Sequence, residues 1–239
     1  MTTIIAECGI NFSPDKKLAL EMIAEAKRCG ADIAKFQLYK PEELLNPDDF
    51  IAQYGRESWE CVKAAELLLS DCWELRRKAA EVDIELMFSV FHERYIPGCE
   101  SLGVKRYKIA SNQVHNRELI KAVKDTGKPL IISCPNGKLP ETWDTEDKLL
   151  FCVPMYPATP AMYEGVDYGC FDGISDHTIG IGTSIEAIKN GAQIVEKHFT
   201  LDRKMPGPDQ VVSIEPLQLE ALVTYGREAV NSQEVNGED

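Results

Sequence analysis

Several features that define common protein classes are absent from this sequence of 239 residues. No apolar run approaches the ~18 residues that suggest a membrane-spanning helix, and no basic segment precedes an apolar stretch at the N-terminus. Basic residues are the minority, and the formal net charge of −13 disfavours contact with nucleic acids or anionic membranes. We therefore expect a soluble, cytoplasmic protein that binds neither a membrane nor a nucleic acid.

The eight cysteines form no CxxC pair, which disfavours both a zinc knuckle and a secreted disulfide framework. Reduced thiols in a cytoplasm fit this scatter better. Cys8 and Cys134 adjoin polar residues at predicted strand ends, but a free cysteine most often packs as a small buried hydrophobe. We prefer that interpretation to a nucleophilic function.

Short apolar runs alternate with longer amphipathic runs along the whole chain, and no low-complexity linker divides them. Eight strands is a number that closes a barrel, and this length suits one. We predict an α/β fold, a (β/α)8 TIM barrel, with one domain over residues 1–230 and a flexible acidic tail at 231–239. The predicted strands are 3–6, 33–37, 85–89, 106–110, 129–133, 149–153, 171–174 and 193–196.

Helical patterns occupy most of the connections between these strands. They fall at 16–29, 59–82, 93–102, 117–126, 161–168, 182–190 and 216–230, with a weak one at 139–144. Residues 41–58 contain two prolines and several acidic residues and read as a long loop after the second strand. Such loops usually shape the active site of a barrel.

Polar side chains gather where the predicted strands end, which is where TIM barrels carry their active sites. Lysines at these ends offer cations to a phosphate or carboxylate, and serines offer hydroxyl donors to the same oxygens. The alternative is a buried Lys–Glu pair that stabilises the barrel, for example Lys35 with Glu7. The strand-end residues are Glu7, Lys35, Gln37, Ser89, Lys108, Ser111, Ser133, Tyr156, Ser175 and Glu196.

Two of the four histidines, His177 and His198, follow successive predicted strands and lie near acidic residues. A single histidine there would be read as a strand cap. Two neutral imidazoles on adjacent strand ends would instead converge on one divalent ion of Mn, Fe, Co, Ni or Zn. The pair therefore predicts a metal site.

Six collinear motifs resemble the sialic acid synthase (N-acetylneuraminate synthase) family over nearly the whole chain. The most specific are Ser175-Asp176-His177-Thr178 and Glu196-Lys197-His198-Phe199, the latter followed by Gly207-Pro208-Asp209. The others lie at 4–11, 34–37, 107–111 and 127–133. The resemblance implies a metal-dependent transferase that condenses phosphoenolpyruvate with an aldehyde sugar, such as N-acetylmannosamine, giving a nonulosonic (sialic-acid-type) acid and phosphate.

The resemblance also implies functions for particular residues. His177 and His198 would hold a divalent metal, Mn or Mg, and the expected catalytic residues are Glu7, Lys108 and Gln113. Phosphoenolpyruvate would be surrounded by Lys35, Ser89, Lys108, Ser111, Ser133 and Ser175, whereas the sugar would face Gln37, Tyr156 and Asp209.

The sequence departs from the family pattern at three positions. Phe12 replaces a histidine, Gln113 a glutamate tied to sugar binding and proton transfer, and Pro154 an asparagine that helps to bind phosphate. Family members also normally continue into an antifreeze-like C-terminal domain that supplies an arginine to the sugar, and we expect this chain to lack it. A homodimer or a separate capping partner would then complete the site.

Two other interpretations remain open. A catalytically silent relative could bind phosphoenolpyruvate or a sugar phosphate as a sensor or assembly subunit, which Gln113 and Pro154 favour. The intact lysines, the two histidines and Glu7 oppose it, so we expect an enzyme. A different phosphate-handling barrel enzyme, such as an aldolase or isomerase, fits the six motifs poorly.

Overall fold

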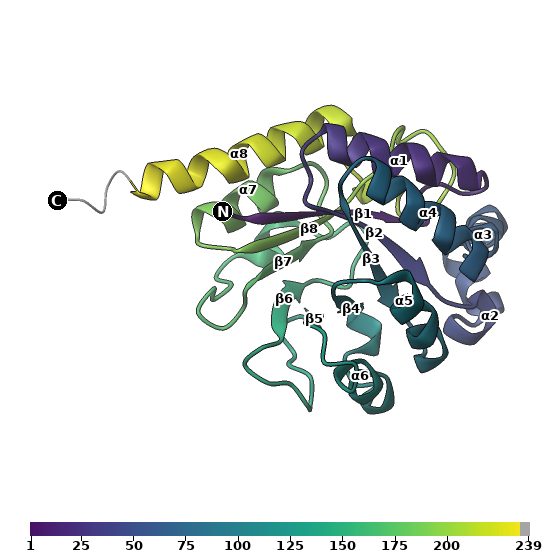
Figure 1. Ribbon diagram of the computed structural model, residues 1–239. Coiled ribbons are helices and arrows are strands. Elements are labelled where there is room, and N and C mark those ends of the chain that lie inside the picture. The colour runs from purple at the N-terminus through teal and green to yellow at the C-terminus, as the bar shows by residue number, and fades with distance from the viewer. Residues whose placement is uncertain (235–239) are drawn as a thin grey trace.

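Eight parallel strands form a closed barrel in the computed structural model, which describes residues 1–234 (Figure 1). The strands pair in chain order, and the last pairs with the first. This arrangement confirms the predicted TIM barrel, and every predicted strand overlaps an observed one. The strands are β1 (Thr3–Gly9), β2 (Ile33–Leu38), β3 (Glu85–Val90), β4 (Tyr107–Ile109), β5 (Leu130–Pro135), β6 (Lys148–Cys152), β7 (Gly173–Asp176) and β8 (Ile194–His198).

Helices surround much of the barrel, and α8 runs along the outside beside α7 (Figure 1). The α-helices are α1 (Lys16–Arg28), α2 (Pro41–Leu44), α3 (Pro47–Ala64), α4 (Leu69–Glu81), α5 (Ile96–Leu102), α6 (Arg117–Lys124), α7 (Gly182–Lys189) and α8 (Pro216–Glu234). Short 3₁₀ helices are η1 (Glu93–Tyr95), η2 (Ser111–Gln113), η3 (Pro160–Tyr163) and η4 (Gln210–Val212). Among the described residues, no helix is long and apolar enough to cross a membrane.

Helix α1 shows how local sequence sets these elements. The Asp15 side chain accepts a hydrogen bond from the Lys17 backbone N–H and so caps the first turn. Gly30 follows the helix with a φ of +86°, a backbone conformation that residues with a Cβ rarely adopt. The face packed on the barrel consists of Ala19, Met22, Ile23 and Ala26, at helical spacing.

Inside the barrel, the inward-facing side chains change from apolar to polar along the strands. The apolar layer consists of Ile5, Ile33, Met87, Ile131, Leu150 and Ile194. Because alternate side chains of a strand share a face, the next inward position lies two residues further toward the C-terminal end. In β1, β2 and β8 that position holds Glu7, Lys35 and Glu196, which are buried. The polar site therefore rests directly on an apolar floor.

Several predicted connections were wrong. Residues 41–58 are not a loop, because α2 and the first part of α3 occupy most of them, each with a proline in its first turn. The single helix expected at 59–82 is split between α3 and α4. The weak helix at 139–144 does not form, and 161–168 contains only part of the short η3 and then turns. The described residues 136–147 and 153–172 therefore contain no α-helix.

The predicted boundary between the domain and its tail falls within a helix, since α8 continues to Glu234. The remaining residues of the predicted tail, 235–239, lie outside the described residues. Whether they form a flexible tail stays a prediction.

Replacing Gly173 by Ala should destabilise barrel closure. An added Cβ would lie 1.7 Å from the backbone oxygen of Ile194 on the paired strand, so β7 and β8 would have to separate. We expect Gly173→Ala to reduce the free energy of unfolding by about 3 kcal/mol. The urea midpoint measures this loss.

The matched control is Gly226→Ala in α8, where the added Cβ would meet side-chain atoms no closer than 3.6 Å. Because alanine favours a helix over glycine by up to ~1 kcal/mol, this variant should be as stable as the parent or more so. Equal urea midpoints for Gly173→Ala and the parent would contradict the steric argument.

Candidate active site

Polar side chains from β1 to β5, from β7 and β8, and from the loops after β4, β6 and β7 meet at the C-terminal end of the barrel. They line a small inner cavity of about 50 Å³. Of the expected site residues, only Gln113 and Asp209 do not line it, and Asp209 lines the cavity immediately outside. The inner lining is Glu7, Lys35, Gln37, Ser89, Lys108, Ala110, Ser111, Ser133, Tyr156, Ser175, His177, Glu196 and His198.

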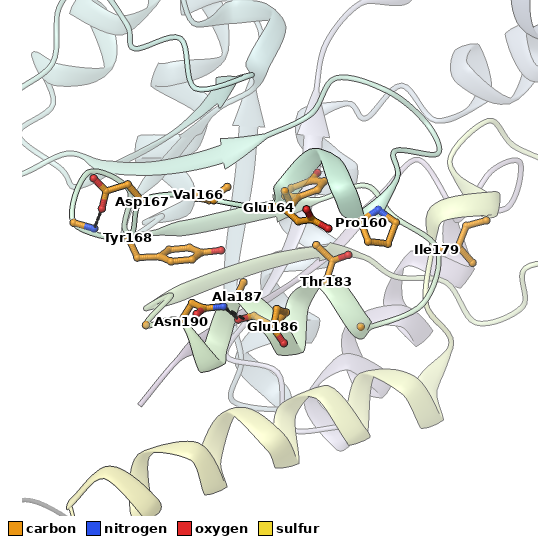
Figure 2. Close-up of a pocket in the computed structure, with 15 residues that line it drawn as sticks. Pro160, Glu164, Val166, Asp167, Tyr168, Ile179, Thr183, Glu186, Ala187 and Asn190 are labelled. Carbon is orange, nitrogen blue, oxygen red and sulfur yellow. Dashed lines mark hydrogen bonds between the residues drawn. The ribbon is translucent and has the colours of Figure 1, made fainter.

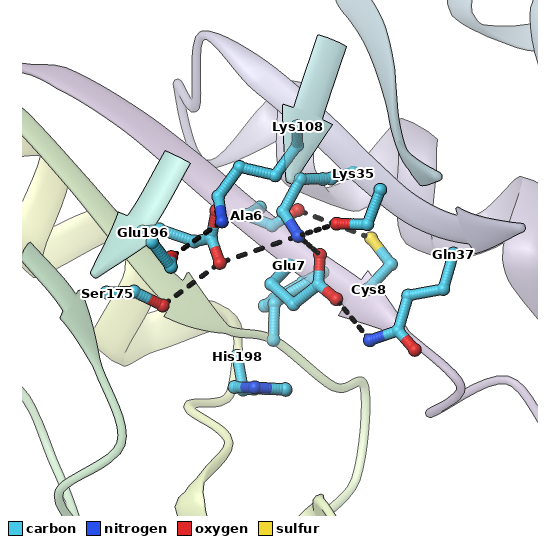
Figure 3. A network of polar contacts seen from close by, with 12 residues as sticks. Ala6, Glu7, Cys8, Lys35, Gln37, Lys108, Ser175, Glu196 and His198 are labelled. Atoms are coloured by element: carbon cyan, nitrogen blue, oxygen red, sulfur yellow. Dashed lines mark hydrogen bonds and ion pairs between the residues drawn. The ribbon is translucent and has the colours of Figure 1, made fainter. Parts of the chain in front are cut away.

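Four buried charges form the centre of this inner cavity (Figure 3). The Nζ of Lys35 lies 2.6 Å from Glu7 Oε2 and 3.4 Å from Glu196 Oε1. The Nζ of Lys108 lies 3.9 Å from Glu196 Oε2, and no residue in this group is more than 5% exposed. The Lys35–Glu7 pair that the sequence offered as an alternative therefore exists, as one part of a larger cluster.

Serine hydroxyls complete the contacts of both lysines. The Lys35 Nζ donates to Ser89 Oγ at 2.9 Å, and the Lys108 Nζ donates to Ser133 Oγ at 2.6 Å. Ser175 Oγ donates to Glu196 Oε1 at 3.0 Å. Ammonium and hydroxyl groups thus share one cavity, which is the donor combination that suits anionic oxygens.

Burial and neighbouring charges move the pKa values of this cluster in different directions. Burial raises the pKa of Glu7, although Lys35 opposes the change. Burial also disfavours the charge of Glu196, but Lys108 and Lys35 lower its pKa nevertheless. Burial lowers the pKa of Lys108, whereas Glu196 and Glu7 raise that of Lys35 in spite of its burial. Glu7 is therefore the carboxyl group of the pair that gains a proton more readily.

The two predicted metal ligands lie close together, with ring centroids of His177 and His198 5.6 Å apart. Burial lowers the pKa of His177 to about 4 and that of His198 well below its usual value, so both rings are neutral. The Nδ1–H of His177 donates to the Val153 carbonyl at 2.6 Å. Because Nδ1 carries the hydrogen, Nε2 of the neutral ring keeps a free lone pair and can act as an acceptor. This Nε2 lies 3.0 Å from the Tyr156 hydroxyl.

His198 offers a second nitrogen. Its buried Nδ1 has no hydrogen-bond partner within the described part of the chain, and the nearest carboxylate oxygen, Asp209 Oδ2, is 3.7 Å away. No set of three His, Cys, Asp or Glu side chains in that part is arranged to hold a metal ion. Two imidazoles are fewer ligands than a divalent ion normally takes, so water or substrate oxygens would have to supply the others.

An outer cavity of about 530 Å³ opens above the inner one and shares Gln37, Ser111, Tyr156 and His198 with it. Asp209 lines this outer cavity, and burial raises its pKa to about 7. One wall of the outer cavity comes from the segment that contains α2 and α3. Its members are Leu44, Leu45, Asn46, Asp49, Phe50, Gln53 and Tyr54.

Sequence reasoning missed these wall residues because it read 41–58 as a loop. Asn46 followed by Pro47 was the available signal, since the Asn46 side chain caps α3 and Pro47 occupies its first turn. Phe50 then holds the helix in place through ring contacts with Tyr54 and Trp59. Sequence reasoning also named Glu196 only as a strand-end residue, although it contacts both lysines.

The structure gives a physical account of two departures from the family pattern. Phe12 is fully buried and packs against Phe36, so position 12 belongs to the core of this protein. Gln113 lines neither cavity, and its Oε1 accepts a hydrogen bond from Asn116 Nδ2 at 2.9 Å. The position of Gln113 outside both cavities does not support the catalytic function expected of it.

A second buried ion pair supports the loop that carries His177. Lys197 lies 3.2 Å from Asp176 Oδ2, and its Nζ also donates to the Thr178 carbonyl. Asp176 accepts further hydrogen bonds from Ser184 and from the Thr178 backbone and hydroxyl. This network ties the segments before and after His177 to β8.

A separate cavity of about 750 Å³ lies between α7 and the turns that follow η3 (Figure 2). None of the expected site residues lines it. Its charged lining residues are the carboxylates Glu164, Asp167 and Glu186, so it does not suit an anionic substrate.

Comparison with known proteins identifies close relatives of this chain. Residues 22–237 match the model of the NeuB family. The chain is 35% identical to the N,N'-diacetyllegionaminic acid synthase of Legionella pneumophila, over 95% of this chain and 71% of that protein. It is 31% identical to the human N-acetylneuraminate-9-phosphate synthase, over 92% and 68%. The sialic acid synthetase of Leptospira borgpetersenii has a similar structure, with a TM-score of 0.84, 29% identity, and coverage of 99% and 85%.

Replacing Lys197 by Met should destabilise the protein strongly, because the fully buried Asp176 side chain would lose its cationic partner. Removing one member of a buried pair typically costs about 3 to 5 kcal/mol. Urea unfolding measures the loss. Lys121→Met is the matched control, since Lys121 pairs with Asp125 at 2.6 Å on the surface, and such pairs contribute about 0 to 1 kcal/mol. Equal losses in the two variants would contradict this account.

Proposed function

The chain belongs to the NeuB family, and we propose that it condenses phosphoenolpyruvate with an aldehyde sugar resembling N-acetylmannosamine. The products would be a nonulosonic acid and phosphate. It is a synthase of the condensing class, in the biosynthesis of acidic sugars.

One observation carries the proposal: two buried lysines meet four serines on the axis of a barrel in a strongly acidic chain. Phosphoenolpyruvate carries a phosphate and a carboxylate, both of which need cations or hydroxyl donors once they leave water. We assign Lys35, Lys108, Ser89, Ser111, Ser133 and Ser175 to its binding.

The proposed reaction forms one carbon–carbon bond. Carbon 3 of phosphoenolpyruvate attacks the aldehyde carbon, and the aldehyde oxygen takes up a proton and becomes a hydroxyl group. Of the two protons of the water that adds at carbon 2, one balances this uptake and the other leaves with phosphate. Water adds at carbon 2, where positive charge develops, and the carbon–oxygen bond to phosphate then breaks. We assign the acceptance of the water proton to Glu7, because its raised pKa makes it a better general base.

We further propose that His177 and His198 hold a divalent ion. The neutral rings and the fixed tautomer of His177 support this assignment. Nitrogen ligands suit Mn²⁺ better than Mg²⁺, which prefers oxygen. When bound, the ion would act as a Lewis acid on the acceptor aldehyde. Gln37, Tyr156 and Asp209 would contact the sugar.

The cellular location and the assembly belong to the same proposal. Every cysteine in the described residues is free, which supports a reducing cytoplasm. The outer cavity is open to the surface, so a second copy or a capping partner could cover the sugar. We propose a homodimer as the simplest such arrangement.

Phosphoenolpyruvate should stabilise the protein against heat. A ligand at a hundred times its dissociation constant adds about 2.7 kcal/mol to the free energy of unfolding. Lys108→Met should abolish most of this increase, because a donor from the centre of the cavity is lost. Thermal melts of each variant with and without phosphoenolpyruvate measure it, and Lys121→Met serves as the surface control. An undiminished shift in Lys108→Met would refute the assignment of that lysine.

Removing either imidazole should abolish tight Mn²⁺ binding while the fold persists, since both rings lie at the mouth of the barrel above its apolar floor. We expect His177→Ala and His198→Ala to give no calorimetric Mn²⁺ signal and to keep the parent circular dichroism spectrum. His115→Ala, at an exposed position, should bind like the parent. Full Mn²⁺ occupancy in a variant that lacks both His177 and His198 would disprove the assignment.

A further inference from the structure

A tyrosine outside both cavities of the site bonds the backbone around His177. Tyr163, from η3, is buried, and it lines the separate cavity beside α7 but neither the inner nor the outer cavity. Its hydroxyl donates to the Ser175 carbonyl at 2.9 Å. The same oxygen accepts hydrogen bonds from the backbone N–H of His177 at 3.1 Å and from that of Val153 at 3.3 Å. The one donor and both acceptor positions of this hydroxyl are thus used.

These hydrogen bonds lie where two neighbouring strands end. The pairing of β6 with β7 stops at Cys152 and Ser175. Beyond this pair, the Tyr163 hydroxyl bridges the two backbones, because it bonds Val153 after β6 and His177 after β7. Val153 is also the residue whose carbonyl accepts the Nδ1–H of the His177 ring at 2.6 Å. One hydroxyl therefore holds both the backbone of His177 and the group that orients its ring.

From these contacts we propose that Tyr163 is a positioning residue for His177, an inference that rests on the metal function proposed for that histidine. An imidazole binds an ion along the lone pair of one nitrogen, and the hydrogen bond at the other nitrogen sets the orientation of the ring. The Val153 carbonyl makes that bond, and Tyr163 fixes the Val153 backbone. The Nε2 of His177 is thereby held 3.3 Å from Ser175 Oγ, a group that lines the inner cavity.

The ring of Tyr163 is fixed separately from its hydroxyl. Phe151 packs edge-on against it with ring centroids 5.6 Å apart, and Phe151 in turn meets Phe171 edge-on at 5.7 Å. Phenylalanine at position 163 would keep this packing and lose only the hydroxyl. The buried N–H groups of Val153 and His177 would then lose an acceptor, so the backbone would have to move toward other partners.

The first experiment observes the His177 ring in the metal-free protein. The chain has four histidines, so variants that each lack one histidine can assign the imidazole signals in nitrogen-15 NMR spectra. The parent should show a neutral His177 ring with its hydrogen on Nδ1. Tyr163→Phe should move these signals toward the average of the two tautomers, because the Val153 carbonyl would no longer be held against Nδ1.

The second experiment measures ligand binding. Loss of a group that orients a metal ligand typically weakens metal binding 10- to 100-fold, so Tyr163→Phe should raise the calorimetric Kd for Mn²⁺ by at least about tenfold. The thermal shift produced by phosphoenolpyruvate should persist, because the lysines assigned to it belong to β2 and β4. Tyr107→Phe is the matched control, since the Tyr107 hydroxyl is also buried but donates to Glu100 of α5 at 2.7 Å. This control should leave both the His177 signals and the Mn²⁺ affinity unchanged.

A folded Tyr163→Phe variant that keeps the His177 signals or the Mn²⁺ affinity of the parent would overturn the inference. Equal losses in Tyr163→Phe and Tyr107→Phe would also overturn it, because any buried hydroxyl would then have the same effect. If Tyr163→Phe does not fold, Phe151→Leu takes its place, since this variant removes the ring that Tyr163 packs against and leaves the hydroxyl present. It should move the same signals by a smaller amount, and unchanged signals would overturn the inference.

The proposed metal function can fail separately. A parent protein that binds no Mn²⁺ would overturn that function. The NMR signals of His177 in the metal-free parent and in Tyr163→Phe would still decide whether Tyr163 positions the ring.

Discussion

The cluster of Lys35, Glu7, Glu196 and Lys108 is the constraint on which the rest of the site depends. Each charge is buried, and each would be unstable there without its neighbours, because burial alone disfavours every one of the charged forms. The four residues come from β2, β1, β8 and β4. Only the closed barrel brings these strands around one axis, so the pairing of β8 with β1 is a condition for the site as well as for the fold.

The barrel could be predicted because its signals are local and repeat. Apolar runs of strand length and polar residues at strand ends recur along the chain, glycine follows α1, α5, α6 and α7, and the order of these signals is that of a parallel barrel. The same regularity located most of the site, since side chains at equivalent strand ends must converge. The contacts within the cluster could not be predicted, because they depend on which lysine reaches which carboxylate across the barrel.

The errors arose where a residue type has more than one use. Proline read as a loop signal at 41 and 47, but proline is also favoured in the first turn of a helix, and Asn46 supplied the cap. Gln113 was placed in the site because its neighbours match a motif, yet a one-turn helix directs its amide to Asn116. Sequence alone cannot show that direction, because it depends on the path of the chain after β4.

The inner and the outer cavity are built by different parts of the chain, which has a consequence for how such a protein can diversify. The inner cavity is lined mainly by residues on strands that hold one another in register, so a change in these strands disturbs the whole barrel. One wall of the outer cavity is made by α2 and the first half of α3, a segment in the connection between β2 and α4. Gly55 interrupts α3 directly after this segment. Changes in this segment can reshape the outer cavity while the buried lysines and glutamates of the inner cavity stay in position. The two cavities are thereby shaped by parts of the chain that can change independently of each other.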